Sequence, residues 1–138
     1  MKKATALCFC LLLTAATAGG RGAARDAAFD AFWKKFKAAV VGGNKPAVAA
    51  LSKFPVGMSY GIRSVRNRAE LLRRYREVFN EQSDAAKCFA RKQPEVDAED
   101  PKRFTVACPN EAGDEVVIYA FELTRAGWKF VALDNANE

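Results

Sequence analysis

The chain has 138 residues, half of them hydrophobic, and a formal net charge of +6 without a single histidine. This composition predicts one folded domain and argues against intrinsic disorder. Because histidine is absent, Ser-His-Asp and Cys-His catalysis are excluded, and we assign no catalytic residues, metal site or cofactor.

The first 18 residues have the layout of a secretory signal peptide: a cationic start (Met1 to Lys3), an apolar run (residues 4–13) and the small-residue cleavage site Ala16-Thr17-Ala18. The apolar run is too short to span a bilayer, so we expect a periplasmic or secreted protein without a membrane span after signal removal. Loss of the two leading lysines leaves a charge of +4, which favours anionic surfaces. We expect no nucleic-acid partner, because an exported protein rarely meets one. We expect residues 19–24 to form a flexible lead-in and residues 25–138 to form one domain.

Four cysteines fall into two groups. Cys8 and Cys10 lie in the apolar run of the signal peptide, whereas Cys88 and Cys108 stay with the mature chain. Two cysteines in an oxidising compartment predict one disulfide, and this pairing leaves no thiolates for zinc.

The N-terminal part of the domain has helical periodicity. Five apolar residues recur on one face of a first helix that stops at Gly42-Gly43: Phe29, Phe32, Trp33, Phe36 and Val40. Asn44 is placed to cap a short second helix, with Pro46 in its first turn, and Phe54-Pro55 ends that element. Residues 56–65 predict one or two short strands. Asn67 and Glu70 then have capping-box spacing, which predicts a third helix from Arg68 to about Phe79.

The C-terminal half changes to strand-like patterns. Four runs alternate with turn-forming stretches: residues 87–92, 104–108, 116–124 and 128–133. Arg125 to Gly127 reads as a three-residue hairpin loop, with glycine where a positive φ is needed. If the first two runs form a hairpin centred near Ala98, Cys88 lies directly opposite Cys108 on the neighbouring strand.

This order of elements predicts an α+β fold, with N-terminal helices packed on a curved, mainly antiparallel sheet of four to six strands. Over residues 25–134 the chain resembles the nuclear-transport-factor-2-like superfamily, the cystatin-like α+β cone. The resemblance rests on the element order and on the segments FDAFWKKF, LLRRYREVF and GWKFVALDN. No catalytic motif of the superfamily matches this chain residue by residue.

The resemblance implies a ligand pocket between the helices and the sheet. Its aromatic candidates are Phe32, Trp33, Phe36, Tyr60, Tyr75 and Tyr119. The alternative is that these side chains simply fill the core. Enzymes of the superfamily place an acid-base residue in this pocket, which here leaves Asp30 or Asp134 beside a tyrosine.

Both faces of the last predicted hairpin are apolar. One face carries Val117, Tyr119, Phe121 and Leu123, and the opposite face carries Val116, Ile118, Trp128 and Phe130. Because an exposed apolar patch marks an interaction surface, the second set predicts a surface for a partner protein or for a homodimer. The alternative is that a strongly curved sheet is wrapped by its own helices and loops.

Six arginines form the densest charge feature: Arg63, Arg66, Arg68, Arg73, Arg74 and Arg76. Their planar guanidinium groups are suited to binding an anionic group. The alternative is a solvated helix face on which Glu70–Arg74 and Arg73–Glu77 form favourable pairs.

The leading interpretation is an exported, non-catalytic domain that binds a small apolar ligand or a partner protein. The alternatives are a pocket enzyme of isomerase or dehydratase type that uses aspartate and tyrosine, and an inhibitor or immunity-type protein.

Overall fold

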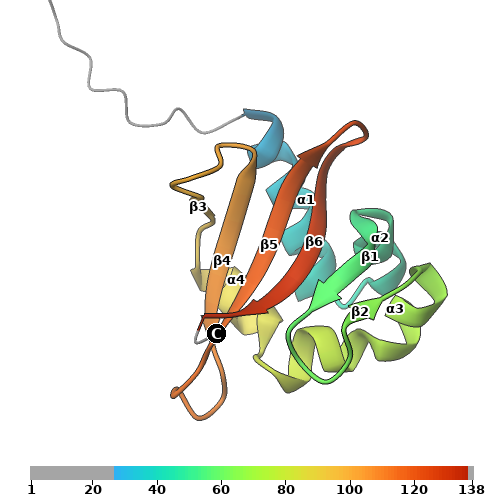
Figure 1. Cartoon of the computed structure of the whole chain (residues 1–138), viewed down its shortest axis with the longest axis vertical. Helices are drawn as coiled ribbons and strands as arrows, with labels where there is room; N and C mark the ends of the chain where they lie inside the picture. The colour runs from blue at the N-terminus through green and yellow to red at the C-terminus, as the bar shows by residue number, and fades with distance from the viewer. Residues whose placement is uncertain (1–26, 137–138) are drawn as a thin grey trace, which may run out of the picture.

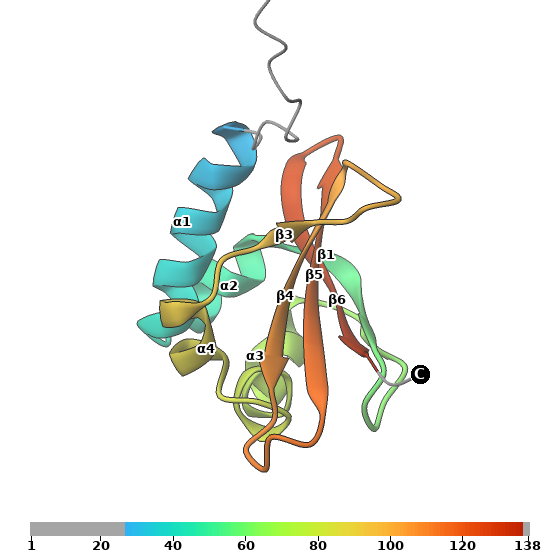
Figure 2. The ribbon, with the colours of Figure 1, turned by 90° about the vertical axis from the view of Figure 1, so that its left-hand side faces the viewer.

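Helices cover one face of a single mixed sheet in the computed structural model, which describes residues 27–136 (Figures 1 and 2). The helical elements are α1 (Ala27–Val41), α2 (Lys45–Ala50), α3 (Arg68–Arg76), the π-helix η1 (Glu77–Glu81) and α4 (Ala85–Arg91). The strands are β1 (Ser52–Met58), β2 (Ser64–Val65), β3 (Glu95–Val96), β4 (Arg103–Pro109), β5 (Val116–Thr124) and β6 (Gly127–Asn135). The predicted signal peptide and lead-in lie outside the described residues.

The sheet has six strands in the order β2-β1-β6-β5-β4-β3, so β1 lies beside the last strand of the chain (Figure 1). The β1–β6 pair is parallel and the other neighbouring pairs are antiparallel. The predicted α+β class, with helices on a mainly antiparallel sheet, is therefore confirmed.

Local sequence signals locate the first two helices correctly. The five apolar residues of the α1 stripe are all buried, and α1 ends just before Gly42, with Gly43 at a φ of 65°. The side chain of Asn44 accepts a hydrogen bond from the backbone N–H of Ala47 at 3.2 Å, which caps α2 as expected.

The prediction of a strand over residues 87–92 was wrong, because this segment belongs to helix α4. The Asp84 carboxylate accepts the backbone N–H of Lys87 at 3.0 Å and so caps the helix. On the side away from β5, the strand that pairs with β4 is the two-residue β3. Cys88 therefore reaches Cys108 from a helix, and the expected hairpin centred near Ala98 does not form.

Three predicted boundaries also moved. Phe54-Pro55 lies inside β1, where the pairing with β6 is irregular and needs no N–H from the proline. The third helix changes to a π-helix after Arg76. Thr124 pairs with Gly127, whose φ is 88°, so only two residues separate β5 from β6.

The ladder between β5 and β6 contains one extra residue, Val131. Consecutive residues of β5 pair with Phe130 and Ala132, so Val131 forms a bulge. Side chains alternate along a strand, and the bulge therefore brings Trp128 and Phe130 to the same side as Leu133. That side faces the helices.

Because of the bulge, the prediction that Trp128 and Phe130 form half of a partner surface was wrong. Trp128 is 5% exposed and Phe130 fully buried, and their rings pack against Phe29 and Phe36 of α1. The strict alternation assumed from the sequence had placed both residues on the opposite face.

Deletion of Val131 should restore an unbroken ladder and turn large core side chains toward solvent. We expect the deletion variant to lose cooperative thermal unfolding. The matched substitution Val131→Ala keeps the residue count and should lower the free energy of unfolding by only about 1 kcal/mol. Thermal melts followed by near-UV circular dichroism test this, and native-like melting of the deletion variant would contradict the role of the bulge.

Candidate functional site

Aromatic rings fill the space between α1 and the sheet. Phe32 and Phe36 lie 5.7 and 5.0 Å from Phe121 of β5, measured between ring centroids, and Trp33 lies 5.0 Å from Phe89 of α4. Each of the three α1 side chains is at most 8% exposed. These pocket candidates therefore act as core residues in this structure.

The Tyr119 hydroxyl is hydrogen-bonded inside the protein. It donates to the carbonyl oxygen of Val78 at 3.1 Å and lies 3.0 Å from Ser83 Oγ. Because the carbonyl can only accept, the single phenolic proton goes to Val78, and Ser83 must be the donor to Tyr119. Burial raises the pKa of Tyr119 above its ordinary value, so this hydroxyl stays protonated at neutral pH.

The other two tyrosines occupy different environments. Tyr75 of α3 is 5% exposed, and its hydroxyl has no hydrogen-bond partner among the described residues. Burial raises its pKa, and Lys45 Nζ lies 5.4 Å from its ring centroid. Tyr60, between β1 and β2, is half-buried against the core. The ring of Phe79 packs against Tyr75 and Tyr119 at 4.8 and 5.8 Å.

The two tyrosines of known bonding state make a matched pair for mutation. Tyr119→Phe leaves the buried Val78 carbonyl without its donor and should lower the free energy of unfolding by about 1–3 kcal/mol. Tyr75→Phe removes a hydroxyl that has no partner among the described residues and should be neutral or stabilising. Urea unfolding at neutral pH measures both. Equal losses in the two variants would contradict this assignment of the hydroxyls.

The two candidate acids do not face the tyrosines. Asp30 is exposed on α1. Asp134 of β6 accepts a hydrogen bond from Arg103 at 2.9 Å, and the same guanidinium bonds Glu122 at 2.7 Å and lies 3.6 Å from Asp97. This network lies on the outer face of the sheet, and the inward-pointing Tyr119 lies on the other.

The arginine stretch is partly neutralised by carboxylates. Glu70 accepts hydrogen bonds from the backbone N–H and the Nε of Arg66, at 2.9 and 3.2 Å, and Arg74 Nε lies 3.4 Å away. Asn67 caps α3 as predicted, by accepting the N–H of Glu70 at 2.9 Å. Glu77 pairs with Arg74 at 2.7 Å, whereas the sequence had suggested Arg73 as its partner.

These contacts make stability depend on pH through Glu70. The hydrogen bonds from Arg66 hold the pKa of Glu70 below its ordinary value of 4.5, so its contribution is present above that value and is lost as the pH falls through the folded-state pKa. We expect Glu70→Gln to be less stable than the wild type at pH 6, with a smaller difference at pH 3. Guanidinium unfolding across this range is the measurement, with the exposed Glu99→Gln as control. A difference that does not change with pH would refute the prediction.

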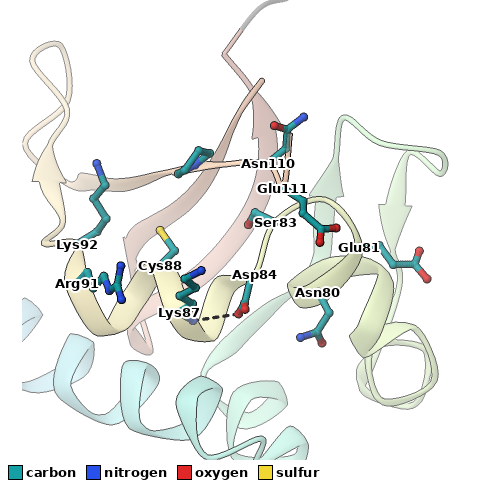
Figure 3. Close-up of a pocket in the computed structure, with 11 residues that line it drawn as sticks. Asn80, Glu81, Ser83, Asp84, Lys87, Cys88, Arg91, Lys92, Asn110 and Glu111 are labelled. Carbon is teal, nitrogen blue, oxygen red and sulfur yellow. Dashed lines mark hydrogen bonds between the residues drawn. The ribbon is translucent and has the colours of Figure 1, made fainter. Parts of the chain in front are cut away.

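A surface groove of about 510 Å³ lies between α4 and the turn after β4 (Figure 3). Three cations line it from α4 and the residue that follows: Lys87, Arg91 and Lys92. Figure 3 shows Arg91 and Lys92 toward one end and Glu81 and Glu111 toward the other, with Lys87 beside Asp84 between them. The remaining lining residues are Asn80, Glu81, Ser83, Asp84, Cys88, Pro109, Asn110 and Glu111.

The Cys88–Cys108 disulfide, which the structure confirms, forms part of this groove. It joins α4 to β4 with the two Cα atoms 5.8 Å apart. Cys108 is fully buried, whereas Cys88 is half-buried and lines the groove. Closing a loop of this length stabilises a fold by about 3 kcal/mol, and here it also holds one wall of the groove in place.

Sequence reasoning missed the groove, because it treated residues 87–92 as a strand. The spacing of Lys87 and Arg91 was visible in the sequence, and Asp84 was a recognisable helix cap. These two signals together would have placed both cations on one helical face.

Among residues 27–136, His, Cys, Asp and Glu side chains nowhere gather in groups of three or more that could hold a metal ion. The helices of this same part of the chain are too short or too polar to cross a membrane.

No protein-family model and no curated protein matches the chain. Three similar solved structures share its backbone course at low identity. A hexachlorocyclohexane dehydrochlorinase, LinA-type3 from Novosphingobium barchaimii LL02, is 12% identical with a TM-score of 0.45, over 79% of this chain and 83% of that one. An NTF2-like protein with a cystatin-like fold from Novosphingobium aromaticivorans is 15% identical with a TM-score of 0.43, over 78% and 77%.

The third is a putative calcium/calmodulin dependent protein kinase II association domain from Xanthomonas campestris. It is 12% identical with a TM-score of 0.43, over 78% of this chain and 83% of that one. The fold named for one of these structures is the one that the sequence resemblance implies. At these identities and TM-scores, the likeness carries no argument about activity.

Proposed function

We propose that this chain is an exported, non-catalytic protein that binds a partner protein through its surface. The observation that carries the proposal is the packed interior. The rings of Phe32, Trp33 and Phe36 occupy the space where the resemblance implied a ligand pocket. A small apolar ligand would have to displace these rings, so a partner on the surface fits better.

The placement of the acids supports the same choice over the pocket enzyme. General acid-base chemistry of the expected kind needs a carboxylate within hydrogen-bond reach of the reacting group, beside a tyrosine donor. Asp134 is bound to Arg103 on the outer face, Asp30 is exposed, and the proton of Tyr119 goes to Val78.

Of the two surfaces that can receive a partner, the groove beside α4 has the stronger support. Val116 and Ile118 remain on the outer sheet face, but Val116 is only 37% exposed and Ile118 half-buried. The Arg103 network also lies on that face, so it is not a continuous apolar patch. A homodimer through the sheet stays a prediction.

Site-specific photo-cross-linking in producing cells tests this function. One variant carries the cross-linker at Glu111 in the groove, and its control carries it at Thr105 on the outer sheet face. We expect the Glu111 variant to form an adduct with a different envelope protein, which should bind again when both purified proteins are mixed.

The mature protein purified without its partner should also contain no titratable thiol after denaturation, because Cys88 and Cys108 are bonded and the predicted signal cysteines are removed. Adducts from Thr105 alone would move the docking surface to the sheet. If neither position gives an adduct, the partner-binding function is rejected.

A further inference from the structure

The side chains of the three cations that line the groove form no ion pair within residues 27–136, although three acids line the same groove. Lys87 and Arg91 lie one helical turn apart on α4, and Lys92 directly follows the helix; no ion pair involves them in this part of the chain. Like charges at this spacing destabilise a helix. Arg66, which precedes α3, and Arg74 within it differ, since they share Glu70.

The acids of the groove form no ion pair with these three cations. Asp84 accepts the backbone N–H of Lys87 and so caps α4, and Glu81 forms an ion pair with Arg76 at 2.8 Å. Glu111 remains on the opposite side of the groove from the cations (Figure 3). None of the three acids forms an ion pair with Lys87, Arg91 or Lys92, so these cations remain available to a ligand, and a ligand complementary to them is anionic.

The form of the groove favours an extended chain over a compact anion. The cations are arranged along one side, from Lys87 to Lys92, and do not converge on one point (Figure 3). Half-buried Cys88 and exposed Pro109 add apolar surface, and Asn110 supplies an amide. The disulfide holds α4 against β4, so the spacing of the cations is fixed before binding.

We propose that the groove binds an extended acidic segment of the partner protein, whose Asp and Glu carboxylates pair with Lys87, Arg91 and Lys92. Arg91 offers a planar fork that matches a carboxylate, and the two lysines add point charges on either side. This inference rests on the proposed partner-binding function and specifies the chemistry of the partner.

Binding of a synthetic peptide to the mature, disulfide-bonded protein tests the inference. The probe is a blocked hexapeptide of alternating Asp and Glu with an uncharged dye, followed by fluorescence anisotropy at low salt. We expect saturable binding that weakens at least about tenfold in the Lys87→Gln/Arg91→Gln/Lys92→Gln variant. The Asn and Gln version of the peptide should not bind.

The matched control is Lys35→Gln/Lys53→Gln/Lys102→Gln, which removes the same net charge from exposed positions outside the groove. It should retain the affinity of the wild type. Equal weakening in both triple variants would overturn the proposal, since the peptide would then respond to net charge alone. Displacement of the peptide by inorganic pyrophosphate at matched ionic strength would also overturn it, because the groove would then be a compact-anion site.

Photo-cross-linking from Glu111 in the Lys87→Gln/Arg91→Gln/Lys92→Gln protein separates this inference from the function on which it rests. Loss of the adduct is expected. An adduct that persists, in a protein that no longer binds the peptide, would refute the acidic segment but leave partner binding intact. Absence of any adduct in the otherwise wild-type protein would reject the function itself.

Discussion

At Val131 the ladder between β5 and β6 gains one residue, and the two large aromatic side chains that precede it in β6 face the helices as a result. Without this bulge, Phe130 and Trp128 would lie on the outer face and the space beneath α1 would lose two of its rings. The packing of these two rings against α1 follows from one irregular backbone position.

Such an interior also explains how the polar groups near it are used. A buried hydroxyl needs a partner, and Tyr119 finds one in the Val78 carbonyl of the π-helix, with Ser83 as a second. An acid-base role for Tyr119 would need its phenolic proton, which is already donated to the Val78 carbonyl. The Tyr119 hydroxyl therefore serves the structure.

Charge is arranged differently on the two sides of the molecule. On the outer sheet face, Arg103 is surrounded by Asp97, Glu122 and Asp134, so this cation is neutralised within the fold. Beside α4, Lys87 and Arg91 form no ion pair in the described part of the chain. Lys87 and Arg91 repel each other across one helical turn, and they are the side chains that the proposed acidic segment would pair with.

The sequence by itself determined what depends on neighbours along the chain: the stripe of α1, the caps at Asn44 and Asn67, and the helix-then-sheet order that defines the α+β class. It also identified the Cys88–Cys108 pair by elimination. Only the tertiary structure decided that residues 87–91 form a helix and that one extra residue reverses the faces of β6. It also decided that Lys87, Arg91 and Lys92 line a groove together with the disulfide-bonded Cys88. Short apolar runs and single-residue bulges leave no periodic signal, so their outcome is set by contacts between segments far apart in the chain.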